Sequence, residues 1–381
     1  MSRDFLRQMP GADQYFSKGV NFFYRLHIDP ILFFLLVLLS LLGLGILYSA
    51  SGQNIEYVEK QAVRLSVAFG LMFFLAQLDP NVFKRWSPWL YLIGLMALFG
   101  VLFFGVGAKG AQRWLQFPGL PRFQPSEFMK LVVPMGVAWF LANRYLPPSF
   151  KVVCLALLII FVPVVLIVKQ PDLGTSLLIA SAGMFVLLLA GLSWRLIAGF
   201  SALVAAFAPI LWIFIMHDYQ RQRVLTFLNP ESDPLGSGWN IIQSKTAIGS
   251  GGLWGKGWLN GTQSQLDFLP ESHTDFIIAV CAEEFGFVGV ALLLFVYLLI
   301  VLRGLYIAVK AQDSYSRILA GGLILTFFIY IFVNIGMVSG ILPVVGVPLP
   351  LVSYGGTSAV TLMAAFGVLM SVHTHRKMLT R

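Results

Sequence analysis

Asp275 lies where a long hydrophilic segment meets an apolar run, in the sequence LPESHTDFIIAVCAEEFGFVG. A carboxylate at such a boundary can act as a general base, held ionised by the first amides of the helix and kept basic by partial burial. The spacing Ser272-x-x-Asp275 also fits a capping box, in which the acid only satisfies the amides of the helix. The local pattern therefore leaves two roles open for Asp275, a base or a cap.

Two further acids, Glu283 and Glu284, follow on the same predicted helix. The standard rise places them about 12 Å deeper than Asp275. Ionisable side chains at that depth in a membrane are costly, so we expect both to face the interior of a helical bundle. They are candidates either for a function or for a buried polar contact.

A third group of candidates lies in the segments GAQRWL and FQPSEFMK. Glu127 and Lys130 are three residues apart, which places them on one face of a helix in the favourable order of charges. They form either a local ion pair or a site in which Lys130 meets a pyrophosphate that Glu127 helps to orient. Arg113 is a candidate to clamp phosphate, whereas Trp114 is typical of the aromatic belt of a membrane protein.

The stretch GSGGLWGKG, residues 249 to 257, has the glycines and the lysine of a phosphate-binding loop. It departs from a nucleotide P-loop because Ser250 takes the place of the first glycine and Gly257 takes the place of the final Ser or Thr. Its free amides could still bind phosphate oxygens. The alternative is that the glycines only allow the loop to pack.

The elements that must position these residues are predicted to be transmembrane helices. Hydrophobic residues make up 58% of the 381, charged residues only 11%, and the mean hydropathy is +0.81, which excludes a water-soluble protein. We therefore predict an all-α, polytopic membrane protein with about ten spans in a single domain, 1–381. The apolar runs of spanning length are 30–49, 60–77, 87–105, 126–143, 151–168, 173–192, 194–216, 275–302, 316–338 and 352–372.

The distribution of Lys and Arg among the short loops predicts the orientation. It makes residues 1–29 and 373–381 cytoplasmic tails and residues 217–274 a large periplasmic loop. Several basic residues then remain outside, either because long loops cross the membrane regardless of charge or because an anionic ligand is presented from the outer leaflet. They are Lys60, Arg64, Lys109, Arg113, Arg122, Lys130, Lys169, Arg221, Arg223, Lys245 and Lys256.

Several other classes of protein are excluded or disfavoured. The formal charge of +9 is spread over separate loops, so no nucleic-acid partner is expected. Cys154 and Cys281 are predicted near opposite faces of the membrane, too far apart for a disulfide. His373 and His375 lack a third metal ligand and are expected to belong to the solvated tail. The connection SGILPVVGVPLPLVSYGGTS is uncharged and not helical, which predicts that it lines protein or a cavity.

Six segments, taken in order, resemble the SEDS family of shape, elongation, division and sporulation proteins. They are GAQRW, FQPSE, QPDLGTS, DYQRQRV, LPESHTDF with the following AEE, and GVPLPLVSYGGTS. The resemblance covers the chain from about Gly110 to its C-terminus, and NIGMVSGILPVVGVPLP is more similar to the cell-elongation members than to the division members. It implies a peptidoglycan glycosyltransferase of the inner membrane that polymerises lipid II together with a class B penicillin-binding transpeptidase.

The resemblance also implies roles for single residues. The family's essential aspartate matches Asp275, which favours the base over the cap. The acidic and basic pair of the fourth span matches Glu127 and Lys130, and the outer-loop arginine matches Arg113. For the departing undecaprenyl pyrophosphate we expect the charge to be met by Lys130 and Arg113, together with Arg221, Arg223 and Lys245 from the large loop.

No organic cofactor is expected, a divalent cation such as Mg²⁺ or Mn²⁺ is a further candidate for neutralising the pyrophosphate, and no metal ligand is assigned. Two other functions stay open. A flippase for lipid-linked precursors would depend on Glu283 and Glu284 and would not need Asp275. A silent scaffold for other synthases would depend only on its contacts with partners.

Overall fold

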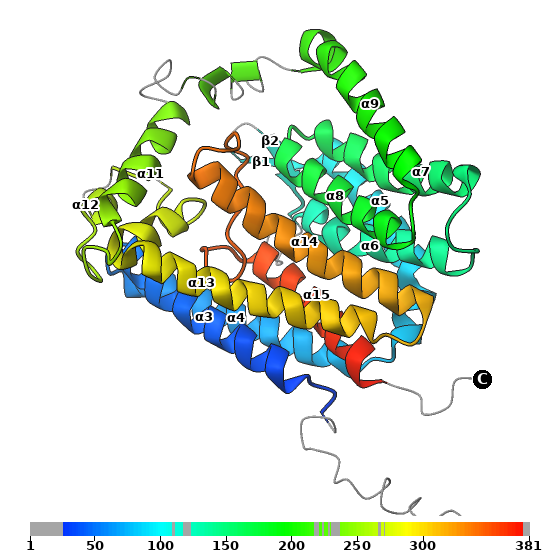
Figure 1. The fold of residues 1–381 in the computed structure, drawn as a ribbon, viewed down its shortest axis with the longest axis horizontal. Coiled ribbons are helices and arrows are strands. Elements are labelled where there is room, and N and C mark those ends of the chain that lie inside the picture. The colour runs from blue at the N-terminus through cyan, green and yellow to red at the C-terminus, as the bar shows by residue number, and fades with distance from the viewer. Residues whose placement is uncertain are drawn as a thin grey trace, which may run out of the picture.

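The protein is a bundle of long helices, seen in a computed structural model (Figure 1). The structure describes residues 26–108, 111–116, 123–216, 221–222, 225–227, 229, 237–265, 268–269 and 271–375. The helices are α3 (Pro30–Ala50), α4 (Ile55–Ala76), α5 (Pro80–Phe104), α6 (Pro125–Ala142), α7 (Phe150–Val168), α8 (Leu173–Leu189), α9 (Trp194–Ile210), the π-helix η2 (Leu211–Ile215), α11 (Ser237–Gly251), α12 (Thr262–Gln265), α13 (Ile277–Val309), α14 (Ser314–Val338) and α15 (Thr357–Thr374). A short antiparallel pair, β1 (Val106–Ala108) and β2 (Ala111–Trp114), follows α5.

Short polar side chains begin several of these helices. Asp29 accepts a hydrogen bond from the Leu32 amide at 2.8 Å, with Pro30 in the first helical position. Asn54, Asp79, Asp172 and Asp313 accept in the same way at the starts of α4, α5, α8 and α14. Each cap fills one of the amides that has no partner within its own helix, so the turns are marked in the sequence.

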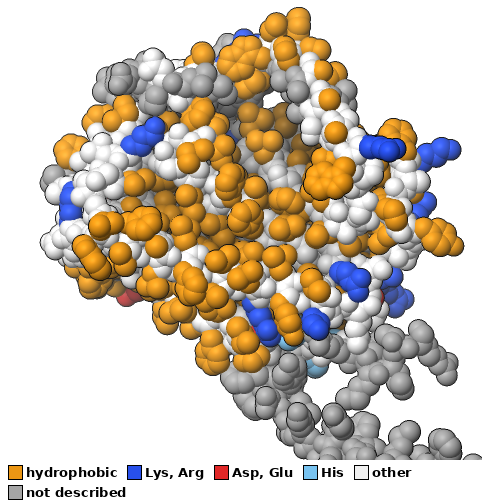
Figure 2. Space-filling view, in the orientation of Figure 1, with side chains coloured by type: hydrophobic (Ala, Val, Ile, Leu, Met, Phe, Trp, Pro, Cys, Tyr) orange, Lys and Arg blue, Asp and Glu red, His pale blue; other side chains and the backbone are white. Residues whose placement is uncertain are grey.

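The prediction of a multi-pass helical membrane protein is confirmed. Within the described residues, six helices are long and apolar enough to span a bilayer, namely α3, α5, α7, α13, α14 and α15, and α8 is a shorter apolar helix. Hydrophobic side chains cover most of the visible face, and Lys and Arg lie mainly toward its edges (Figure 2). The helices α4, α6 and α9 coincide with predicted runs without meeting that criterion, so the count of ten spans stays a prediction.

The helix α3 defines the two ends of the bundle. Its 21 residues extend about 31 Å, close to the thickness of a bilayer's hydrocarbon core. At its first end, which we call the Asp29 end, Asp29 forms an ion pair with Arg303 of α13 at 2.6 Å, and its Oδ2 lies 2.8 Å from Nδ1 of His373 of α15. The expectation that His373 belongs to a solvated tail is wrong, because it is buried within α15 against Asp29. Hydrogen bonds from His373 and Arg303 outweigh the burial that opposes ionisation, and they hold the pKa of Asp29 well below its usual range. The opposite end, where α3 finishes, is called the Ala50 end.

The long helix α13 is interrupted at Gly286, whose φ of 66° lies in the left-handed region. The backbone of residues 252–257 fills the gap. The amides of Phe287 and Val288 donate to the carbonyls of Gly252 and Leu253, at 2.9 and 3.2 Å. In return, the amides of Lys256 and Gly257 donate to the carbonyls of Glu283 and Glu284, at 3.0 and 2.9 Å. The break therefore leaves these four backbone groups hydrogen bonded, as an apolar surrounding requires.

Candidate functional site

Asp275 lies at the Ala50 end, in a turn just before α13. The helix begins at Ile277 with Phe276 as its N-cap, and no side chain caps it. The hydroxyl of Ser272 instead donates to the carbonyl of Ala50 at 3.0 Å. The capping-box interpretation of Asp275 is therefore wrong, because the N-cap is Phe276, four residues after Ser272, and Asp275 lies before the helix instead of in its first turn.

The position of Asp275 is fixed by α14 and by the connection before α15. The buried Asn334 of α14 donates to the backbone carbonyl of Asp275 at 2.8 Å and to that of Val347 at 2.7 Å. A Cβ atom placed on Gly346 would lie 3.5 Å from Oδ2 of Asp275, and the φ of Gly346 is +75°. The half-buried carboxylate thus adjoins a turn that only glycine adopts readily.

Glu127 and Lys130 form the predicted pair near the start of α6. Nζ of Lys130 lies 2.6 Å from Oε1 of Glu127, and both side chains are buried. The same ammonium group lies 4.9 Å from the centre of the Tyr330 ring. Among the described residues, the second carboxylate oxygen of Glu127 is buried without a hydrogen-bond partner, so the ion pair leaves an acceptor that a ligand could fill.

Arg113 lies beside Asp172, which is an acid that the sequence analysis did not single out. Nη1 of Arg113 is 3.6 Å from Oδ2 of Asp172, and Nη2 donates to the carbonyl of Pro171 at 2.5 Å. Nε of the same guanidinium group is buried and has no partner in the described part of the chain. Asp172 also caps α8 through the Thr175 amide at 3.2 Å. Its place before an apolar run signalled only a cap, although it belongs to the segment QPDLGTS that carries the family resemblance.

These groups converge on α14 and on the turn at residues 345–346. Tyr330 and Asn334 are one turn apart on α14, and they contact Lys130 and Asp275 respectively. A Cβ atom on Gly174, two residues after Asp172, would lie 2.8 Å from the carbonyl oxygen of Val345. Since Gly346 adjoins Asp275, the start of α8 and the Asp275 turn meet neighbouring residues of one turn.

The other basic candidates are placed elsewhere or are outside the description. The guanidinium group of Arg221 donates to the carbonyls of Trp212 and Ile213 in η2, both at 2.8 Å. Lys245 is exposed on α11, and its side chain crosses the position where a Cβ atom of Gly340 would lie. Arg223 lies outside the described residues. The substrate-binding roles of these three residues stay predictions.

Glu283 and Glu284 hold the 256–263 segment on α13. Oε1 of Glu283 accepts from Nζ of Lys256 at 2.7 Å and from the amide and hydroxyl of Thr262 at 2.8 and 2.9 Å. It also accepts from the Gln263 amide at 3.0 Å. Glu284 accepts a hydrogen bond from Ser49 of α3. The contacts of Glu283 match the role of a buried polar contact. Oε2 of Glu284 is buried without a partner among the described residues, and the role of Glu284 stays a prediction.

The glycine-rich stretch 249–257 packs against α13. Cβ atoms on Gly251 and Gly255 would lie 2.0 and 2.1 Å from the carbonyl oxygens of Ala282 and Glu284. The amides of Gly255, Lys256 and Gly257 already donate to backbone carbonyls. Binding of phosphate by these amides is therefore excluded in this arrangement, and the packing alternative is confirmed.

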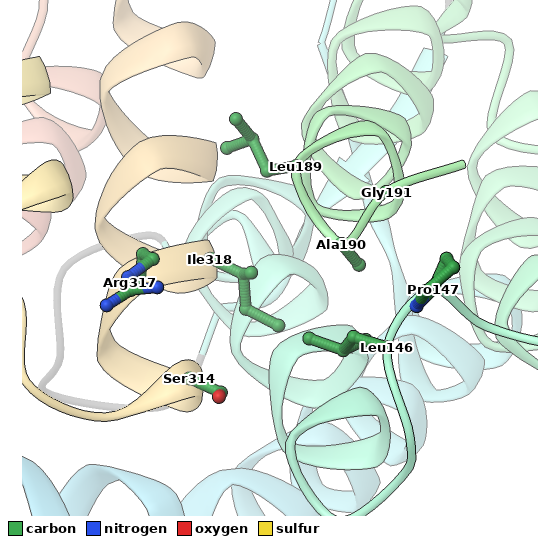
Figure 3. A pocket seen from close by; sticks show the side chains of 8 residues that line it. All are labelled: Leu146, Pro147, Leu189, Ala190, Gly191, Ser314, Arg317 and Ile318. Carbon is green, nitrogen blue, oxygen red and sulfur yellow. The ribbon is translucent and has the colours of Figure 1, made fainter. Parts of the chain in front are cut away.

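A separate cavity of about 460 Å³ opens near the junction of α13 and α14, toward the Asp29 end. Ile318 and Leu146 point toward each other across it (Figure 3). It contains none of the predicted site residues. Its lining consists of Leu146, Pro147, Leu189, Ala190, Gly191, Ser314, Arg317 and Ile318. Among the residues that the structure describes, no group of three or more His, Cys, Asp or Glu side chains is suited to a metal ion.

Comparisons with known proteins agree with the resemblance. Residues 29–378 match the model of a family described as cell cycle proteins and named for FtsW, RodA and SpoVE. The chain is 57% identical over 361 residues to the peptidoglycan glycosyltransferase MrdB of Escherichia coli K12, covering 95% of this chain and 97% of MrdB. It is 36% identical over 366 residues to a probable peptidoglycan glycosyltransferase FtsW of Trichlorobacter lovleyi, covering 92% and 94% of the two chains.

Two solved structures share the fold. One is a chain of a peptidoglycan synthase complex that coordinates polymerization and crosslinking, with a TM-score of 0.81 and 32% identity, covering 92% of this chain and 98% of that one. The other is the rod shape determining protein RodA of Thermus thermophilus, with a TM-score of 0.69 and 29% identity, covering 92% and 98%.

Proposed function

The chain belongs to the FtsW, RodA and SpoVE family and is a peptidoglycan glycosyltransferase, and from this premise we propose that it polymerises lipid II with Asp275 as its general base. The observation that carries the assignment is the placement of Asp275. Its half-buried carboxylate adjoins the Gly346 turn, and one turn of α14 separates the residues that contact Asp275 and the buried Lys130. A base and a buried cation thus share one region of the Ala50 end.

The reaction transfers the growing strand to a new lipid II molecule. The 4-hydroxyl oxygen of the lipid II GlcNAc attacks the anomeric carbon of the strand's terminal MurNAc, and a new glycosidic bond forms with inversion. Asp275 takes the hydroxyl proton. The bond from the anomeric carbon to the pyrophosphate oxygen breaks, and undecaprenyl pyrophosphate leaves with the electron pair. Because pyrophosphate is a good leaving group, one base is sufficient.

The protein's main electrostatic task is to stabilise the charge that grows on the leaving pyrophosphate. Lys130 supplies a buried positive charge, and Arg113 supplies a guanidinium group whose Nε has no partner among the described residues. Glu127, with one unfilled carboxylate oxygen, would help to hold Mg²⁺ or Mn²⁺ if the pyrophosphate brings one.

The Ala50 end is proposed to face the periplasm. The basic residues of the short loops then lie mainly at the Asp29 end, which satisfies the positive-inside rule for an inner-membrane protein with both termini in the cytoplasm. In this orientation residues 217–274 are periplasmic and 1–381 form one membrane domain. Substrates carried on undecaprenyl chains reach Asp275 from the outer leaflet.

The proposed partner is a class B penicillin-binding transpeptidase of the elongation machinery. Support comes from the similar chain that belongs to a synthase complex coordinating polymerization and crosslinking, and from the 57% identity to MrdB. The flippase alternative depended on Glu283 and Glu284. Glu283 accepts hydrogen bonds from Lys256, Thr262 and Gln263 of its own chain, and Oε1 of Glu284 accepts one from Ser49, whereas Oε2 of Glu284 is buried without a partner among the described residues.

The direct test is Asp275→Asn in purified protein with its transpeptidase partner and lipid II. General base catalysis contributes about 10²- to 10⁴-fold, so glycan synthesis should fall by at least about 100-fold, with an unchanged melting temperature. Glu59→Gln, which removes an exposed carboxylate of α4, is the matched control and should retain full activity. Undiminished synthesis by a folded Asp275→Asn protein would remove this assignment.

A further inference from the structure

A cationic and aromatic cluster adjoins the Asp275 turn through residues that the catalytic assignment does not use. It consists of Tyr57 and Arg64 of α4, His273 of the turn, and Tyr354, and we call it the Arg64 cluster. Cζ of Arg64 lies 4.5 Å from the centre of the Tyr354 ring. The Tyr57 ring lies 5.2 Å from the rings of both His273 and Tyr354. The Tyr354 amide donates to the carbonyl of His273 at 2.9 Å, which joins the cluster to the chain just before Asp275.

Arg64 lies well inside the bundle. Among the described residues, no acidic side chain pairs with it. It lies nine residues after Ile55, the first residue of α4, or about 13 Å along the helix. It is half-buried, and no carboxylate in the described part of the chain lies within ion-pairing distance. Lys60, one turn earlier, is exposed and pairs with Glu56 at 2.5 Å. A cation left without an acid near the apolar layer is costly, and such residues mark the path of an anionic ligand.

The cluster is held in place before any ligand arrives. The buried Gln61 of α4 donates from Nε2 to the carbonyl of Ser353 at 3.3 Å, and its Oε1 accepts from the amide of Gly355 at 3.3 Å. These two bonds fix the backbone on both sides of Tyr354. The Arg64 side chain then lies against Gly356, where a Cβ atom would be 3.2 Å away. A preorganised cation beside aromatic rings is the composition expected of a site for a charged, sugar-bearing ligand.

Polymerisation needs two lipid-linked molecules at once, and the two cationic groups reach Asp275 by different routes. The start of α8, where Asp172 adjoins Arg113, meets Val345, whereas the Arg64 cluster includes Tyr354, nine residues further along the same connection. Lys130 and Arg113 are the groups suited to a departing pyrophosphate, which belongs to the donor.

Resting on the proposed function, we propose that the Arg64 cluster is the acceptor site. Arg64 holds the pyrophosphate of the incoming lipid II, whose bond to the sugar is not broken in that cycle. Tyr57, His273 and Tyr354 hold the sugar head, so that the GlcNAc 4-hydroxyl is presented to Asp275. The acceptor and donor lipids therefore enter beside different helices, α4 for the acceptor and α6 for the donor.

The test separates the two substrates chemically. Lipid II with a 4-deoxy GlcNAc can act only as donor, because it has no attacking hydroxyl. Lipid II with a methylene phosphonate in place of the anomeric oxygen can act only as acceptor, because its sugar cannot be released. With both present, the protein and its partner make one transfer, and KM is measured for each while the other is saturating.

We expect Arg64→Ala to raise KM for the phosphonate acceptor by at least about tenfold, the factor that 1.4 kcal/mol represents, and to leave KM for the 4-deoxy donor unchanged. Arg64→Lys should give a smaller rise because it keeps the charge but loses the guanidinium fork. Tyr57→Leu, which removes one ring, should also raise only the acceptor KM. Arg85→Ala, which removes an exposed charge of α5, should change neither value.

An unchanged acceptor KM in folded Arg64→Ala, or a rise in the donor KM alone, would overturn the acceptor site. If Arg64→Ala does not fold, an unchanged acceptor KM in both Arg64→Lys and Tyr57→Leu overturns it equally. These outcomes are distinct from a failure of the proposed function, which is tested by Asp275→Asn in the same assay. An inactive Asp275→Asn protein beside a normal Arg64→Ala protein would remove only the acceptor site.

Discussion

Two buried acids in this bundle, Glu283 and Glu127, are satisfied to different extents. Near the break in α13 at Gly286, Glu283 accepts hydrogen bonds from Lys256, Thr262 and Gln263 of its own chain. In the cluster on α6, Glu127 pairs with Lys130 through one oxygen, and the other is buried without a partner among the described residues. Unfilled hydrogen-bonding capacity is costly to keep. Oε2 of Glu284 is also buried without a partner in the described part of the chain, so an unfilled oxygen alone does not identify a ligand site. The difference teaches that Glu283 maintains the structure, whereas Glu127 combines an unfilled oxygen with a buried cation and is available to a ligand.

The strongest challenge to this comparison is Lys130→Ala. Removing one donor aimed at a developing negative charge costs about 10²- to 10³-fold in kcat, so we expect glycan synthesis to fall by that factor. The variant also leaves Glu127 as an unpaired buried acid, which lowers stability. The double variant Glu127→Gln, Lys130→Met removes both charges and should melt near the parent protein while staying inactive. Recovery of synthesis in the double variant would assign the pair to structure alone.

Glu283→Ala should give the opposite pattern. It removes the acceptor of several hydrogen bonds at once, and we expect a loss of about 3 kcal/mol in the free energy of unfolding. Activity per folded molecule should stay within a few-fold of the parent, because Glu283 contacts no reacting group in the proposed mechanism. Thermal melting and lipid II polymerisation on the same preparation measure both quantities. A stable but inactive Glu283→Ala protein would contradict the comparison.

The glycines of residues 249–257, a stretch that packs against α13, offer a finer test with an internal control. In Gly255→Ala, the new Cβ atom would lie 2.1 Å from the carbonyl oxygen of Glu284 at a φ of +78°, so we expect a loss of about 2 kcal/mol in stability. Gly249→Ala lies in α11 with nothing within 4 Å of the new atom. It should be neutral or stabilising by up to about 1 kcal/mol. Equal melting temperatures for the two variants would show that residues 252–257 are not tightly packed against α13.

The smallest expected effect concerns the ion pairs at the Asp29 end. The pKa of Asp29 is held below its usual range despite burial, so its contribution to stability is present above the unfolded value of about 4 and is lost as the pH falls further. Asp29→Asn keeps the helix cap but loses the charge, and should cost about 1 kcal/mol at pH 5. Melting curves from pH 5 to pH 3 should show the parent's advantage shrinking. An advantage that grows on acidification would contradict the assigned charge.

The fold was largely predictable because each membrane helix corresponds to a continuous run of apolar residues in the sequence. The run 30–49 matches α3 (Pro30–Ala50), and the caps at Asp29 and Asp313 mark real helix starts. The break in α13 was not predictable. Gly286 occurs in the apolar sequence EEFGFVG, and its unusual φ depends on a loop that meets it only in three dimensions.

Some contacts of the candidate site were likewise predictable from the sequence, and others were not. Glu127 and Lys130 were paired correctly because three residues on a helix fix their proximity. Asp172 was overlooked because its ion pair with Arg113 joins residues 59 positions apart. The capping role of Asp275 failed for a related reason, since Ser272 donates to Ala50 of α3 instead of capping α13, and Asn334 of α14 holds the carbonyl of Asp275.

The interruption at Gly286 also imposes an order on biogenesis. In the proposed orientation, residues 252–257 must cross the bilayer before their four backbone hydrogen bonds with residues 283–288 can close. Until then the nascent α13 has unpaired amides and carbonyls around Gly286, and residues 287–309 are its long uninterrupted part. Insertion of residues 287–309 and docking of the translocated segment would then be separate events, and docking would complete α13.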